Sequence, residues 1–183
     1  QNGLEVFDLA ESPHLLIGGV PGFGKSNFLH TAIHALLPQA MVCVIDMKRL
    51  EFSYLSRYCA LAKNEAQALV FMKALEREME RRIDILEGLG VVKVQEYPGD
   101  DMPMIVLVID EVSEIQNENT IFLVDRIVRL ARAVGISVVA ATQRPSKKVK
   151  LFADDTRDMF LARLSFQMAD EVSSRIILGE QNP

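Results

Sequence analysis

Long apolar runs, a cysteine framework and an initiator methionine are all missing from this sequence of 183 residues. No apolar stretch approaches the roughly 20 residues that span a bilayer, and no signal-peptide pattern opens the chain. The two cysteines, Cys43 and Cys59, lack the spacing of a metal site, which fits a reducing cytosol. Because the chain opens on Gln1 and Asn2, we interpret it as a piece of a longer protein.

Histidine is also scarce, and basic residues are fewer than acidic ones. His30 and His34 are one helical turn apart, but they and His14 are the only histidines, so a zinc site is not favoured. The 20 Lys plus Arg against 25 Asp plus Glu give a net charge of −5. That balance argues against a protein that coats nucleic acid with its whole surface, although a small loop can still make such a contact.

The composition is that of one soluble globular domain. Hydrophobic residues make up 49% of the chain and charged residues 25%, which excludes disorder, collagen-like repetition and a disulfide scaffold. The length suits a single buried core. We therefore expect residues 1–183 to form one domain, without internal repeats or a domain linker.

Apolar runs alternate with helical patterns along the chain. A long helix is predicted from Asn64, which with Gln67 resembles a capping box, and Glu78 four residues before Arg82 predicts a pair on the helix surface. Because the strands are continuously apolar and separated by helices, the fold class is α/β, with a mainly parallel sheet flanked by helices. The predicted strands are 14–19, 41–45, 104–109, 136–141 and 160–166, and the predicted helices are 27–37, 64–88 and 121–134.

A phosphate-binding loop is the strongest chemical signal. Residues 19–26 fit G-x-x-x-x-G-K-S, between a predicted strand and a predicted helix. Glycines let backbone N–H groups approach phosphate oxygens, Lys25 can reach the β- and γ-phosphates, and the Ser26 hydroxyl can bind Mg²⁺. We expect a nucleoside triphosphate and Mg²⁺ as ligands, with the nucleotide held by Gly19, Val20, Pro21, Gly22, Phe23, Gly24, Lys25, Ser26 and Asn27.

Two carboxylates follow the most apolar strand. Asp110 and Glu111 stand at its carboxyl end, where ligands of open α/β sheets bind. An acidic pair there is also common at a solvated helix start, but the phosphate loop favours a catalytic interpretation. Asp110 would hold magnesium through water, and Glu111 would orient or deprotonate the attacking water. Together these features predict hydrolysis of a nucleoside triphosphate.

Further polar residues have two interpretations. Thr142 and Gln143 end another apolar strand, where they either sense the γ-phosphate or form a turn closed by Pro145. Arg129 and Arg132 share a helix face, either as solvated side chains or with one acting as an arginine finger on a neighbouring subunit.

The order of these motifs resembles the motor domain of the FtsK/SpoIIIE family of DNA translocases. The resemblance covers nearly the whole chain and rests on residues 13–16, 19–26, 45–48, 78–82, 108–111, 130–136, 141–145 and 173–177. It implies a RecA-like ATPase that moves double-stranded DNA through a homohexameric ring, in the cytoplasmic part of a membrane-anchored bacterial protein. By motif, it implies catalytic roles for Lys25 and Glu111, a sensor role for Gln143 and a finger role for Arg132, with Ser26 and Asp110 at the metal.

Several features depart from the cell-division members of that family. Pro21 and Phe23 replace small or hydroxylated residues, the segment after Glu111 is short, and the chain stops at Pro183. These differences suggest a mobile-element member, such as a conjugative DNA-transfer ATPase. The same broad family includes ATPases of type VII protein secretion, so a protein substrate is an alternative. A module that binds ATP for assembly is another, although Glu111 favours hydrolysis.

Basic loop residues are candidates for contacts to a phosphate backbone, or are ordinary solvated side chains. Aromatic residues do not alternate with them, so base stacking on single strands has little support. These candidates are Lys48, Arg49, Arg144, Lys147, Lys148 and Lys150.

Overall fold

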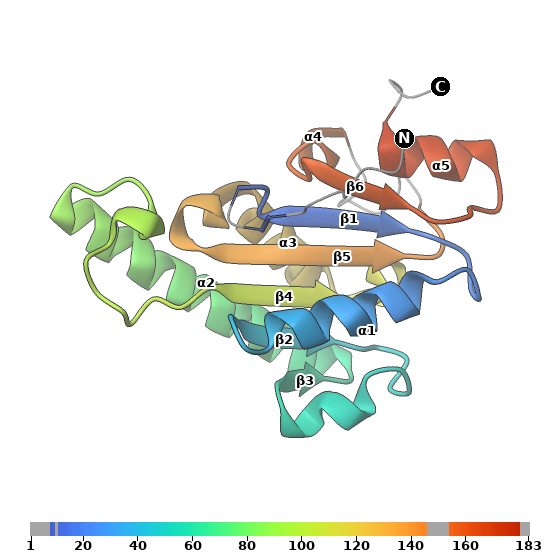
Figure 1. Cartoon of the computed structure of the whole chain (residues 1–183), viewed down its shortest axis with the longest axis horizontal. Helices are drawn as coiled ribbons and strands as arrows, with labels where there is room; N and C mark the ends of the chain where they lie inside the picture. Colours follow the sequence, from blue (N-terminus) through green and yellow to red (C-terminus); the bar gives the residue numbers. More distant parts are fainter. Residues whose placement is uncertain (1–7, 10, 146–153, 180–183) are drawn as a thin grey trace.

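A six-stranded sheet with strand order β3-β2-β4-β5-β1-β6 forms the centre of the computed structural model, which describes residues 8–9, 11–145 and 154–179. Every neighbouring pair of strands is parallel, so all the strands end at the same edge (Figure 1). The α/β class with a parallel sheet is confirmed. The strands are β1 (His14–Gly18), β2 (Met41–Ile45), β3 (Ala60–Ala62), β4 (Ile105–Ile109), β5 (Ile136–Thr142) and β6 (Ala162–Ser165).

Helices cover both faces of this sheet, which is why its central strands are apolar throughout. Helix α1 (Lys25–Leu36) packs on one face through Leu29 and Ile33. The opposite face is covered by α2 (Glu65–Leu89), α3 (Glu118–Leu130) and α5 (Glu171–Leu178) (Figure 1). Shorter elements are α4 (Asp154–Arg157) and the 3₁₀ segments Ser53–Arg57, Val94–Glu96, Val112–Glu114 and Ala131–Val134.

Helix α2 begins where the sequence predicts, but two details of the prediction were wrong. The Asn64 side chain accepts a hydrogen bond from the Gln67 N–H at 3.0 Å, whereas the Gln67 side chain accepts from the Lys63 N–H and so does not complete a capping box. Arg82 is buried, not on the helix surface. Its guanidinium donates to Glu78 at 2.7 Å and to the carbonyls of Val134 and Pro103 at 2.8 and 2.9 Å.

Other boundaries differ from the sequence prediction. The predicted helix 121–134 begins earlier, at Glu118, because Asn117 caps it, and it tightens into a 3₁₀ turn from Ala131. Strand β3 and helix α5 were not predicted. Within the part of the chain that the structure describes, no helix has both the length and the apolar character to cross a bilayer. That residues 1–183 form one domain stays a prediction.

Candidate active site

The glycine-rich loop leaves β1 at the carboxyl edge of the sheet and leads directly into α1. Backbone hydrogen bonds hold both of its sides, because the Gly19 N–H donates to the Thr142 carbonyl and the Val20 N–H to the Gln167 carbonyl, at 3.1 and 2.9 Å. The loop therefore lies between the ends of the two strands that flank β1. Such an edge is where open α/β sheets bind ligands.

Glycine is required in this loop for two separate reasons. Gly24 precedes α1 with a φ of 99°, a left-handed conformation that side-chain-bearing residues adopt only with strain. A Cβ on Gly19 would lie 2.8 Å from the Cβ of Phe166, so a side chain there would displace the loop. Both positions keep the backbone close to its neighbours, as a phosphate cradle requires.

A cavity of about 320 Å³ opens over the start of α1. Its volume is at the lower end of small-ligand sites, and the first turn of α1 supplies the N–H groups and positive dipole end that attract an anion. Gly19 lies against Phe166, outside the lining, and the side chain of Phe23 is half-exposed. The lining residues are Val20, Pro21, Gly22, Gly24, Lys25, Ser26, Asn27, Glu51 and Gln143.

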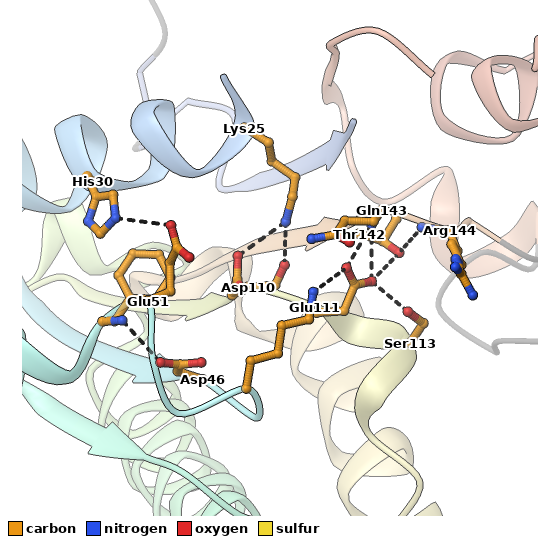
Figure 2. A network of polar contacts seen from close by, with 12 residues as sticks. Lys25, His30, Asp46, Glu51, Asp110, Glu111, Ser113, Thr142, Gln143 and Arg144 are labelled. Carbon is orange, nitrogen blue, oxygen red and sulfur yellow. Dashed lines mark hydrogen bonds and ion pairs between the residues drawn. The ribbon is translucent and has the colours of Figure 1, made fainter. Parts of the chain in front are cut away.

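Lys25 turns from the loop onto Asp110, 85 residues away in the sequence. Its ammonium group donates to the Asp110 carbonyl oxygen at 2.9 Å and to the carboxylate oxygen Oδ1 at 3.2 Å (Figure 2). Burial raises the pKa of the Asp110 carboxyl, and the charge of Lys25 opposes that rise. The structure thus brings together the predicted phosphate-binding lysine and the predicted metal-binding aspartate.

Glu111 is held beside this pair by donors from three places in the chain (Figure 2). Its carboxylate accepts hydrogen bonds from the hydroxyls of Ser113 and Thr142, both at 2.6 Å, and from the Gln143 N–H at 2.9 Å. Lys48 completes the set with an ion pair at 3.7 Å. The acid predicted to act on water is therefore buried and fixed in orientation.

The sequence did not predict the roles of three residues at this site. Ser113 was not singled out, Glu51 was not assigned to the cavity, and Lys48 was expected to contact a polymer. The missing information is strand order: β2 pairs with β4, so the segment after β2 lies next to Asp110 and Glu111. A hydroxyl two residues after a buried acid was the only local signal for Ser113.

The two candidate finger arginines lie away from this cavity. Arg132 belongs to the 3₁₀ segment just before β5, at the amino edge of the sheet, whereas the loop is at the carboxyl edge. Its guanidinium is 3.5 Å from the Glu11 carbonyl oxygen and lines a separate cavity of about 820 Å³. Arg129 lines the same separate cavity and donates to Asp125 and Thr156, at 3.1 and 2.9 Å.

The remaining basic candidates divide into two groups. The Arg49 guanidinium donates to the Lys63 carbonyl at 3.0 Å, and Arg144 is exposed just beyond the site. Lys147, Lys148 and Lys150 lie outside the described residues.

A parallel sheet with a glycine-rich strand-to-helix loop, and with its lysine on a strand-end aspartate, is the fold and site arrangement of P-loop-type ATPases. The family model for the FtsK/SpoIIIE family matches residues 1–112. This chain belongs to the FtsK/SpoIIIE family.

Relatives of known sequence include the DNA translocase FtsK of Rhizobium meliloti (strain 1021), which is 31% identical over 96% of this chain and 25% of its own length. The DNA translocase FtsK of Borreliella burgdorferi is 33% identical over 95% of this chain and 24% of its own length. The chain thus spans about a quarter of the length of the curated relatives it matches.

Two solved structures are similar in both sequence and fold. The pCW3 conjugation coupling protein TcpA, in a monomer form with ATPγS, has a TM-score of 0.83 and 27% identity, covering 97% of this chain and 55% of that one. The cytoplasmic domain of the type VII secretion ATPase EccC of Thermomonospora curvata has a TM-score of 0.72 and 28% identity, covering 91% of this chain and 22% of that one.

Proposed function

We propose that this chain is the ATP-hydrolysing motor of a DNA translocase. The observation that carries the proposal is that Lys25 and Gln143, which line the loop cavity, contact Asp110 and Glu111, in a chain of the FtsK/SpoIIIE family. A module that only binds nucleotide has no need of a buried acid held in one orientation. Glu111 therefore favours turnover over simple binding.

The loop and Lys25 bind the phosphates. The backbone N–H groups of the loop and of the first turn of α1 face an anion, and Lys25 exchanges Asp110 for the β- and γ-phosphate oxygens. Ser26 and Asp110 offer the hydroxyl and carboxylate oxygens that Mg²⁺ prefers, so these residues would hold the metal. When bound, Mg²⁺ neutralises charge that develops on the transferred phosphoryl group.

Glu111 and Gln143 act in the hydrolysis step. Glu111 orients the attacking water and accepts its proton, in the pose that Ser113 and Thr142 impose. Gln143 both lines the cavity and donates its backbone N–H to Glu111. If the Gln143 side chain moves on contact with the γ-phosphate, its backbone N–H carries that movement to the carboxylate of Glu111.

Arg132 acts on the nucleotide of a neighbouring copy. The support is its position at the amino edge of the sheet, from which it does not line the cavity over its own loop. A ring in which the amino edge of one copy faces the loop of the next would complete each site with an arginine finger. We propose a homohexamer around duplex DNA, in the cytoplasm, with any membrane anchor in other parts of the protein.

Duplex DNA is the favoured polymer, because relatives of about 30% identity over nearly the whole chain are DNA translocases. The similarity to a type VII secretion ATPase makes protein the second candidate. We expect linear duplex DNA to raise the rate of ATP hydrolysis severalfold at concentrations that favour assembly. The measurement is steady-state phosphate release with and without DNA, with single-stranded DNA as the control. Hydrolysis that duplex DNA leaves unchanged would favour the protein substrate.

A further inference from the structure

Asp46, the residue directly after β2, fixes the backbone of the turn that follows this strand. Asp46 is fully buried, and its carboxylate accepts the backbone N–H groups of Arg49 and Phe52 at 2.9 and 3.1 Å. Arg49 has a φ of 67°, the left-handed conformation that reverses the chain within this turn. Residues 47–51 are therefore held at the end of the sheet, where Glu51 lines the cavity. The Glu51 carboxylate lies 3.5 Å from His30 Nε2 (Figure 2).

The register between β2 and β4 determines which residues lie beside this turn. Ile45 pairs with Ile109, and the Asp110 N–H donates to the Ile45 carbonyl at 3.2 Å. The residues just beyond the two strands thus emerge side by side. Lys48 comes to lie 3.7 Å from the Oε2 atom of Glu111, with its own side chain 37% exposed against 3% for Glu111.

The charges of the site form two lysine–carboxylate pairs. Asp110 is paired with Lys25, and the adjacent Glu111 is paired with Lys48. Two neighbouring buried carboxylates repel one another and lose hydration, so each needs a nearby cation. Lys25 has a second partner in the proposed function, namely phosphate, whereas Lys48 comes from the turn after β2 and does not line the loop cavity.

We propose that Lys48 is a positioning residue for hydrolysis, acting by fixing the Glu111 carboxylate while Lys25 is engaged with the nucleotide. The assignment rests on the proposed ATPase function. Ser113, Thr142 and the Gln143 N–H all donate to Oε1, and the Gln143 N–H also reaches Oε2. Lys48 pairs with Oε2, the carboxylate oxygen that the two hydroxyls leave uncontacted.

The test compares the wild-type chain with Lys48→Met, Lys48→Gln, Lys48→Arg and the matched control Lys73→Met, whose lysine is exposed on α2. Hydrolysis rates give kcat, and a fluorescent ATP analogue gives the Kd for nucleotide. We expect both neutral variants to lower kcat by about tenfold or more, with Kd changed less than about twofold. Lys48→Arg should recover most of kcat, because a guanidinium also pairs with a carboxylate, and Lys73→Met should match the wild type.

A double-mutant cycle distinguishes positioning from a general structural effect. In a Glu111→Gln background, Lys48→Met should lower the residual rate no further, because its partner charge is already gone. Unchanged kcat in the neutral variants, a parallel loss of nucleotide affinity, or losses that multiply in the double mutant would each overturn the assignment. A wild-type chain that hydrolyses no ATP would instead refute the proposed function, so the two failures are distinguishable.

Discussion

Glu111 is the residue whose surroundings most clearly separate catalysis from binding. It is buried at the end of β4, yet its carboxylate has donors on both oxygens and a lysine nearby. A buried acid with such a complete set of partners is fixed in space, which is what orientation of a water molecule requires.

Replacement of Glu111 by glutamine should uncouple binding from turnover. Glutamine has the same shape but cannot accept a proton, so we expect kcat to fall about 100-fold or more while nucleotide still binds. Phosphate release and nucleotide titration measure the two effects. Lys25→Ala is the informative comparison, because it should lose nucleotide binding itself. Normal hydrolysis by Glu111→Gln would mean that another group activates the water.

At the scale of elements, helix α2 is joined to the sheet layer by a buried charge. Arg82 reaches from α2 to the carbonyls of Val134 and Pro103, which precede β5 and β4. Hydrogen bonds from Arg81, and then from Arg82, lower the pKa of the Glu78 carboxyl from 4.5 to about 2. Glu78 is thus the counter-ion that makes burial of Arg82 tolerable.

This arrangement predicts a defined loss of stability in acid. Because the folded-state pKa of Glu78 is lowered, its contribution is present above pH 4.5 and is lost as the pH falls from about 4.5 to about 2. Glu78→Gln should lower the free energy of unfolding at pH 7 by about 1–3 kcal/mol and should remove that part of the pH dependence. Denaturant titrations at several pH values measure both, with the exposed Glu87→Gln as the control. An equal pH dependence in Glu78→Gln would contradict the assignment.

The elements that the sequence predicts are those with strong periodic signals. The strand at Met41–Ile45 was predicted with its observed boundaries, because its β-branched, apolar residues are buried between layers. Strand β3 has only three residues, Ala60–Ala62, and exists because it pairs with β2, which no local pattern indicates. Arg82 was placed on the surface because charge is usually solvated, and its carbonyl partners are distant in the sequence.

The candidate site was predictable to a similar extent. The loop, Asp110, Glu111 and Gln143 carry recognisable motifs, and the structure brings them to one edge of the sheet. The contribution of Lys48 depends on β2 lying beside β4, which is a property of strand order rather than of local sequence.

At the scale of the whole molecule, the two edges of the sheet carry different parts of the proposed chemistry. The loop cavity opens at the carboxyl edge, and Arg132 stands at the amino edge. One chain therefore presents the proposed phosphate site and the proposed finger at opposite edges of the sheet, an arrangement that suits head-to-tail association into a closed ring.

Mixing experiments test this arrangement. We expect Arg132→Ala chains and Glu111→Gln chains, each nearly inactive alone, to recover ATP hydrolysis when they are mixed, because a Glu111→Gln chain supplies Arg132 to the intact site of its Arg132→Ala neighbour. Rates over a series of mixing ratios measure the effect, and Arg77→Ala, exposed on α2, is the control. Mixtures no more active than the sum of the two separate activities would contradict a shared site.

The contact between Lys25 and Asp110 has a consequence for affinity. Before any phosphate arrives, the lysine already has an anionic partner 3.2 Å away within its own chain. Asp110 thus acts as a tethered competitor for the same ammonium group. The apparent Kd for nucleotide equals the intrinsic Kd divided by the fraction of chains in which Lys25 is free of Asp110. The need to break the contact between Lys25 and Asp110 therefore weakens nucleotide binding.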